Sequence, residues 1–158
     1  MNDKNNFFIS PSLLKITERD VTLLDQEVAD GEGWTSYTNG QMTQTTVFQN
    51  RLTGIFFQGL EQFEVEIEVT DNQLSTRCSC ENHNQVCQHV SALLYAWVHD
   101  ADDFLNVGLF LQDLQNKSHQ ELLEILTDIV QKNPGNIFLL NKNMDSPDSI
   151  EDIDGILN

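Results

Sequence analysis

The sequence predicts an α+β fold, in which helices precede and follow a small antiparallel sheet of about four strands. Three observations predict it. Apolar residues alternate with glutamates over residues 63–69, which is typical of a half-buried strand. Apolar residues recur at helical spacing over residues 90–98. A capping box, Ser118 to Glu121, opens a further amphipathic stretch.

Two helices are expected before the sheet. Ser10-Pro11 offers an N-cap followed by a proline at the first helical position, so a short helix is expected over residues 12–16. A second helix is expected over residues 18–29, and Gly31 ends it. These helices and the glycines after them form the predicted N-terminal segment, residues 1–33.

The strands are expected between turn signals. Asn39-Gly40 is a strong tight-turn signal and predicts a hairpin between residues 34–37 and 42–48. Further strands are expected at residues 52–57, 63–69 and 73–77. One exposed face of the 63–69 strand carries Glu64, Glu66 and Glu68. Because side chains two apart on a strand lie about 7 Å from each other, a solvated face is favoured over a metal or catalytic site.

A helical extension is expected over residues 100–142. After a break at residues 99–103, a helix is predicted over residues 104–115, and a capped helix runs from Ser118 to Lys132. Residues 137–140 are expected to pack back on it, which gives a C-terminal helical pair. His99 and His119 are interpreted as isolated surface or capping residues.

The last stretch, residues 143–158, is acidic and contains no basic residue, which predicts a disordered tail. Four apolar residues in it recur at helical spacing: Ile150, Ile153, Ile156 and Leu157. One hypothesis is that this stripe docks in a groove of a basic partner. The alternative is a tail without function.

The three cysteines of the chain and one histidine form a compact motif: Cys78, Cys80, Cys87 and His89. Three thiols and one imidazole make a complete tetrahedral ligand set for zinc. Residues i and i+2 of a strand face the same way, so Cys78 and Cys80 can converge on one ion. The other two begin the next helix, where the looser first turn lets them converge and the helix dipole favours a thiolate.

The alternatives concern the fourth ligand and the role of the thiols. Three cysteines cannot all pair within one chain, which excludes a complete disulfide framework but leaves inert core cysteines. His83, in the turn, is the alternative fourth ligand, although a solvated loop histidine is favoured there. Four protein ligands leave no open position, which marks one structural Zn²⁺. A metalloenzyme would require that His89 is not a ligand, and we find no phosphate-binding loop and no nucleophile beside a spare histidine. No catalytic residue is therefore assigned.

The charge balance narrows the class of partner. The chain has 25 acidic and 8 basic residues, a net charge of −17, whereas nucleic-acid binders carry a basic footprint. Two explanations of this charge are equally good. One is a partner with a basic surface, and the other is simple solubility or adaptation to salt. Arg51 and Arg77 are the basic residues that a nucleic-acid-binding function would use. We expect no membrane association, and zinc-binding thiols predict the reducing cytoplasm.

The motif resembles the SWIM zinc finger, whose pattern is Cys-x-Cys, a variable spacer and Cys-x-His, often followed by x-x-Ala. The match is tight from Cys78 to Ala92. Residues 34–76 resemble the family's sheet more loosely, so a sheet-plus-finger domain is expected over residues 34–99. SWIM proteins occur beside helicase-type remodelling ATPases, in Mutator-type transposases and among partners of recombinase paralogues. The resemblance implies zinc and a protein–protein adaptor or accessory subunit of a DNA-processing system. A zinc finger that binds nucleic acid directly is the alternative.

Overall fold

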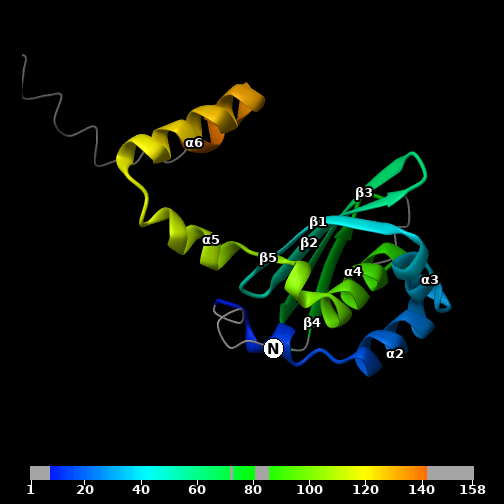
Figure 1. Ribbon diagram of the computed structural model, residues 1–158. Coiled ribbons are helices and arrows are strands. Elements are labelled where there is room, and N and C mark those ends of the chain that lie inside the picture. The colour runs from blue at the N-terminus through cyan, green and yellow to red at the C-terminus, as the bar shows by residue number, and fades with distance from the viewer. Residues whose placement is uncertain (1–7, 72, 81–85, 142–158) are drawn as a thin grey trace, which may run out of the picture. The chain divides into compact units, whose positions relative to one another are not determined.

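A computed structural model describes residues 8–71, 73–80 and 86–141 of the chain (Figure 1). The chain divides into two compact units, Met1–Asp113 and Leu114–Asn158. The predicted α+β class is confirmed, because helices precede and follow a sheet. The acidic tail predicted over residues 143–158, with its apolar stripe, lies outside the described residues.

The first unit begins with the two expected helices. α1 (Pro11–Leu14) begins at the proline, and the Ser10 hydroxyl accepts a hydrogen bond from the Ser12 N–H at 3.2 Å. α2 (Glu18–Ala29) begins with a capping box between Thr17 and Asp20. Side-chain oxygens thus satisfy backbone N–H groups that a helix N-terminus leaves without partners.

The strand predicted at residues 34–37 is wrong, because this stretch lies in α3 (Glu32–Asn39). The reason lies in α2. The buried carboxylate of Asp25 accepts hydrogen bonds from the N–H groups of Gly33, at 2.8 Å, and Trp34, at 3.0 Å. It replaces an N-cap side chain, since Gly31 at the N-cap position has none. Asn39-Gly40 therefore joins a helix to a strand and closes no hairpin.

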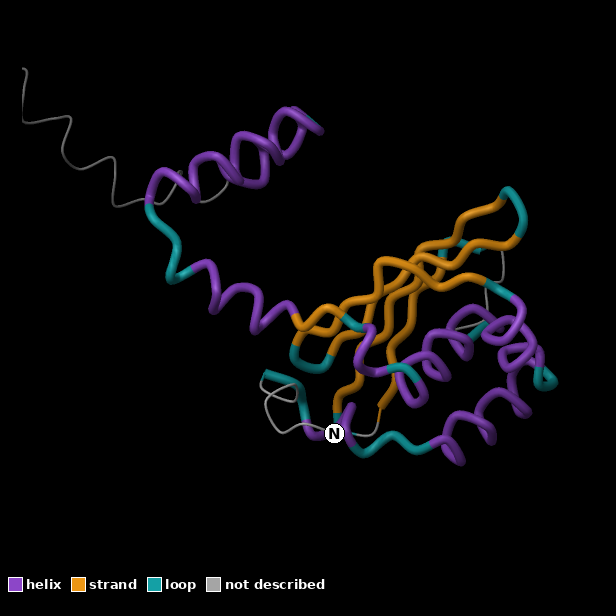
Figure 2. Tube along the Cα trace, in the orientation of Figure 1, coloured by secondary structure: helices purple, strands orange, loops and turns teal. Residues whose placement is uncertain are grey.

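The sheet has five strands in the order β4-β3-β2-β1-β5 (Figures 1 and 2). Four of them form antiparallel pairs, as expected: β1 (Gln41–Phe48), β2 (Arg51–Gln58), β3 (Glu61–Thr70) and β4 (Gln73–Cys78). The fifth, β5 (Leu105–Asn106), pairs in parallel with β1. The sheet is thus the predicted antiparallel one with a short parallel strand added at one edge.

One helix, α4 (Gln88–His99), lies at the centre of the core and packs on one face of the sheet (Figure 2). Every residue from His89 to Trp97 is buried in it. Its apolar side meets the inward-facing residues of β2 and β3, among them Leu52, Phe56 and Ile67. The Trp97 Nε1–H donates to the Leu13 carbonyl at 3.1 Å, which ties α1 to the same helix.

The segment after α4 differs from the single helix expected over residues 104–115. A 3₁₀ turn, η1 (Ala101–Asp103), leads into β5, and only then does α5 (Val107–Leu114) begin. The Asn106 side-chain carbonyl accepts from the Leu109 N–H at 3.1 Å, so it caps a helix that starts after β5. Residues that helical spacing assigned to the helix thus pair with β1 instead.

The second unit contains α6 (His119–Lys132), η2 (Pro134–Asn136) and α7 (Ile137–Asn141). The capping box predicted at Ser118 and Glu121 is present. Residues 137–140 were expected to pack back on this helix. Their apolar side chains are not buried by such packing, since Ile137, Phe138 and Leu139 are all exposed. Proline and glycine in η2 stop α6, as expected, but the apolar residues after them stay open to solvent.

We predict that Asp25→Ala lowers the free energy of unfolding by about 2 kcal/mol, because the buried N–H of Gly33 and the partly buried N–H of Trp34 lose their acceptor. Urea unfolding of the zinc-loaded protein measures this. The control is Glu27→Ala, an exposed acid on the same helix. Equal urea midpoints for the two variants would show that Asp25 does not hold α3.

Candidate metal centre

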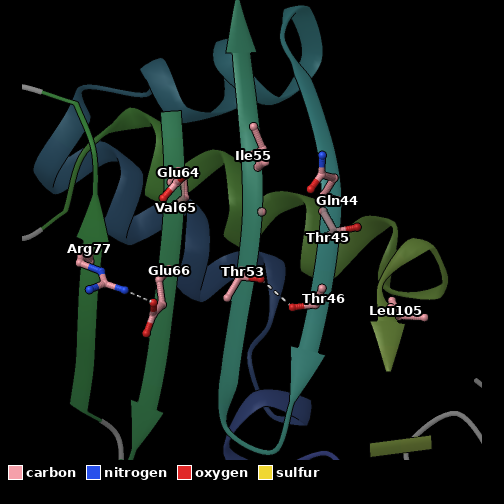
Figure 3. A pocket seen from close by; sticks show the side chains of 11 residues that line it. Gln44, Thr45, Thr46, Thr53, Ile55, Glu64, Val65, Glu66, Arg77 and Leu105 are labelled. Atoms are coloured by element: carbon pink, nitrogen blue, oxygen red, sulfur yellow. Dashed lines mark hydrogen bonds and ion pairs between the residues drawn. The ribbon is translucent and has the colours of Figure 1, made fainter. Parts of the chain in front are cut away.

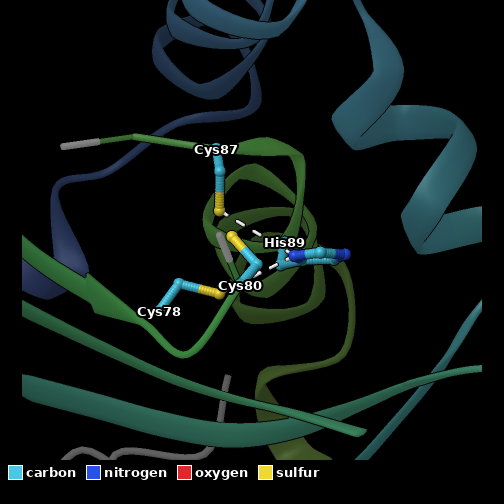
Figure 4. A group of neighbouring side chains, drawn as sticks. All are labelled: Cys78, Cys80, Cys87 and His89. Atoms are coloured by element: carbon cyan, nitrogen blue, oxygen red, sulfur yellow. Dashed lines mark hydrogen bonds between the residues drawn. The ribbon is translucent and has the colours of Figure 1, made fainter. Parts of the chain in front are cut away.

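Two segments of the chain bring the four predicted ligands together (Figure 4). Cys78 ends β4, pairs with Val65 and faces the covered side of the sheet; Cys80 comes two residues later. Cys87 is the N-cap residue of α4, and His89 lies in its first turn. The three Sγ atoms and one imidazole nitrogen all lie within 4.8 Å of one another.

The distances within the cluster fit a tetrahedral zinc site. His89 Nδ1 lies 3.7 Å from Cys78 Sγ and 3.9 Å from Cys87 Sγ. In a tetrahedral site, Zn–S and Zn–N bonds of about 2.3 and 2.0 Å place the sulfur and nitrogen atoms about 3.6 Å apart. The observed separations exceed this edge by only a few tenths of an ångström. All four ligand atoms lie within 4.8 Å of one another, so the cluster could hold one metal ion.

Two aromatic residues of the sheet hold the His89 ring. Phe63 stacks on the imidazole, with ring centroids 4.3 Å apart and planes 17° apart, and Phe56 lies 4.9 Å away. The two phenylalanines are cross-strand partners on β2 and β3. Their rings fix the plane of an imidazole that is 4% exposed. Sequence analysis missed this role, although the alternation in β3 already places Phe63 on the inner face.

The side-chain nitrogen of Gln88 lies 3.4 Å from His89 Nε2, on the side away from the sulfurs. The oxygen and nitrogen ends of an amide exchange places by a simple flip. With the oxygen toward the ring, Gln88 accepts a hydrogen bond from Nε2–H. That proton position leaves Nδ1 free as the ligand atom, as outer partners of metal-bound histidines generally do.

The hydrogen bond between Cys78 and Cys87 shifts the pKa of both thiols. The hydrogen bond from the Cys78 thiol lowers the pKa of Cys87 to about 3, and contacts with His89 and the Val90 N–H act in the same direction. That same hydrogen bond, together with burial, raises the pKa of Cys78. The Cys78 thiol thus donates a hydrogen bond to the Cys87 thiolate. A metal ion bound by both sulfurs would displace the proton of that hydrogen bond.

A hollow of about 370 Å³ adjoins the cluster. The end of α2 and the start of α3 form one wall, with Asp30 and Glu32, and Cys80, Cys87 and His89 form the other.

The other candidates from the sequence lie elsewhere. On the uncovered face of the sheet, Glu66 pairs with Arg77 (Figure 3). Glu66 also pairs with Arg51, and Glu68 lies 3.6 Å from Arg51. A hollow of about 580 Å³ on this face is lined by Glu64, Glu66 and Arg77 and by threonines of β1 and β2. Glu66 and Glu68 are thus ion-paired on the outer face, where Glu64 also lies, and within the described residues only the Cys₃His group could hold a metal ion.

The remaining histidines have different surroundings. His83 lies outside the described residues. His119 is the exposed first residue of α6, in agreement with the expectation. His99 is also exposed, as expected, but it is not isolated: it stacks on Tyr37 at 5.7 Å, contacts Trp34 and Tyr95, and pairs with Glu18 at 3.5 Å. This aromatic group forms because α3 is a helix that brings Trp34 and Tyr37 to α4.

No family model matches the chain, and searches of curated proteins and of solved structures found no significant match. The SWIM resemblance therefore rests on the cysteine–histidine motif and on its position between a strand and a helix. Among the helices of the described residues, none is both long and apolar enough to cross a membrane.

We predict that Phe63→Ala lowers zinc affinity about tenfold, because the ring that orients His89 is removed. Competition with a chromophoric chelator at neutral pH measures this. Phe57→Ala is the matched control, since Phe57 lies one residue beyond Phe56 on β2 and faces the other side of the sheet. Equal affinities of the two variants would mean that the sheet does not orient the histidine.

Proposed function

We propose that this chain is a zinc-binding SWIM-type interaction module, and that it serves as a protein–protein adaptor or accessory subunit of a DNA-processing system. One observation carries the proposal: the Cys₃His cluster lies at the junction of β4 and α4 with near-tetrahedral spacing. The motif begins at the end of a strand and ends in the first turn of a helix, and this is the context in which the SWIM motif is expected.

The ion has a structural role in this proposal. Cys78, Cys80, Cys87 and His89 occupy all four positions, so none is open for water or substrate, and we propose no enzymatic activity. Zinc would join the end of the sheet to the start of the central core helix. Structural zinc contributes roughly 10–16 kcal/mol in finger peptides, which is comparable to the whole stability of an ordinary domain.

The surface charge supports a protein partner with a basic surface, rather than direct nucleic-acid binding. Arg51 and Arg77, the two arginines open to a phosphate-binding function, are paired with Glu66 and Glu68. A zinc ion bound by three thiolates and a neutral imidazole leaves the cluster itself at a charge of −1. The SWIM resemblance favours a helicase-type ATPase or a recombinase as the partner, in the reducing cytoplasm.

The zinc site is tested first. We predict one zinc per chain, and we predict that His89→Ala and Cys80→Ser lose both the metal and cooperative unfolding. His119→Ala, which removes an exposed histidine, keeps both. Elemental analysis and thermal unfolding measure these outcomes.

Zinc affinity is expected to fall as pH falls, because protons compete for the three thiolates and the imidazole.

A metal-free wild type that unfolds cooperatively would contradict the zinc proposal. His83→Ala separates the two ligand assignments: loss of zinc in this variant, with retention in His89→Ala, would make His83 the fourth ligand.

The partner class is tested with the same variants. We predict that the zinc-loaded chain and its His119→Ala variant capture a helicase-type ATPase or a recombinase from nuclease-treated extract, whereas His89→Ala does not.

We also predict that the isolated chain binds duplex DNA only weakly at physiological salt, as measured by fluorescence anisotropy. Submicromolar, salt-dependent binding would instead favour the nucleic-acid-binding alternative.

A further inference from the structure

The amphipathic helix α6 has no buried side chain. Its large apolar residues Leu123, Leu126 and Ile129 are 39–45% exposed. A helix of 14 residues is only marginally stable alone in water, even with a good cap. Its apolar side therefore needs a surface to cover it, and the sequence of the helix indicates which surface that is.

Five of the six large apolar residues of α6 are arranged symmetrically about Leu126, and the sixth, Ile125, lies about 100° from Leu126 at the edge of this stripe. Leu122 and Leu123 precede it by four and three residues, and Ile129 and Val130 come three and four residues after it. At about 100° per residue, all five fall on one side of the helix. In an antiparallel pair centred on Leu126, Leu122 meets Val130 of the other helix, Leu123 meets Ile129, and Leu126 meets itself.

Such a symmetric pattern is what a contact between two identical helices requires. At a two-fold interface the same patch lies on both sides, so residue i contacts residue j and residue j contacts residue i. A groove on an unrelated protein imposes no such symmetry on the helix that binds it. The pattern therefore favours a second copy of the chain.

The charges on α6 agree with an antiparallel pair. Its acidic residues, Glu121, Glu124 and Asp128, lie on the side opposite the apolar stripe, so they stay in water when the stripe is covered. An antiparallel pair places the last turn of one copy, with Lys132, beside the first turn of the other, with Glu121. It also opposes the two helix dipoles, whereas a parallel pair brings like ends together.

The local charge permits this contact in spite of the acidity of the whole chain. Residues 114–141 contain two lysines and three acidic residues, a net charge of −1, while the whole chain carries −17. A groove with a basic rim would find few acids beside the stripe of α6. This argues for a second copy over a basic partner at this surface.

We propose that α6 is a homodimerisation helix, which pairs with α6 of a second copy around a two-fold axis through Leu126. Specific interfaces bury about 1,200 Å² or more, so α7 is expected to add its exposed Ile137, Phe138 and Leu139. The dimer carries two metal centres. It would therefore engage a partner with two sites more tightly than one copy does. The pairing itself does not depend on the zinc proposal.

Sedimentation equilibrium of the full-length chain at physiological salt tests the proposal. The wild type is expected to approach twice the 18.0 kDa of one chain as concentration rises. Leu126→Glu and Leu126→Lys are each expected to stay monomeric, because like charges meet at the axis. An equimolar mixture of the two is expected to form dimers again, since glutamate then faces lysine. Gln131→Glu, which adds the same charge on the opposite side of α6, is expected to dimerise like the wild type.

Several results would overturn the proposal. A monomeric wild type would do so, as would a mixture of the Leu126 variants that stays monomeric while both keep the wild-type metal content and circular dichroism. If α6 instead covers another part of its own chain, the wild type is monomeric and Leu126→Glu unfolds at a lower urea concentration. If it docks on another protein, the wild type is monomeric and Leu126→Glu loses partner capture with unchanged stability.

Discussion

The first unit depends on the junction at which β4 ends and the chain turns into α4. Cys78 and Cys80 leave the sheet there, Cys87 and His89 open the helix, and their ligand atoms meet within 4.8 Å. No side-chain oxygen caps α4, and its N-cap position is a cysteine whose pKa is lowered to about 3. A thiolate at a helix N-terminus is favoured by the dipole, so the chemistry of the cluster and the start of the core helix support each other.

The surroundings of the cluster come from both layers of the fold. From the sheet, Phe56 and Phe63 hold the imidazole of His89. From the helical layer, Asp25 caps α3, and Gly33 lies so close to α4 that a Cβ atom there would come within 2.2 Å of the Ser91 Cβ. These contacts set the walls of the hollow beside the sulfurs. The cluster is thus the meeting point of the sheet, the central helix and the α2–α3 turn.

The charged residues are distributed unevenly between the outer face of the sheet and the second unit. On the outer face of the sheet, both arginines are paired with glutamates. The described part of the second unit is nearly neutral and exposes apolar side chains instead. The proposed contact with a basic partner therefore depends on charge, whereas the proposed self-association depends on the burial of apolar side chains.

The sequence by itself determined the features that arise from short-range spacing. The alternation in β3, the bounds of α2, the cap of α6, and the grouping of Cys78, Cys80, Cys87 and His89 all concern residues within a dozen positions of each other. Only the tertiary structure decided that residues 34–37 are helical, because their cap, Asp25, is supplied from α2. It also decided that β5 pairs with β1, that two phenylalanines orient His89, and that the arginines are neutralised. Each of these depends on residues that are distant in sequence and meet only when the sheet and helices pack, and local periodicity carries no information about such contacts.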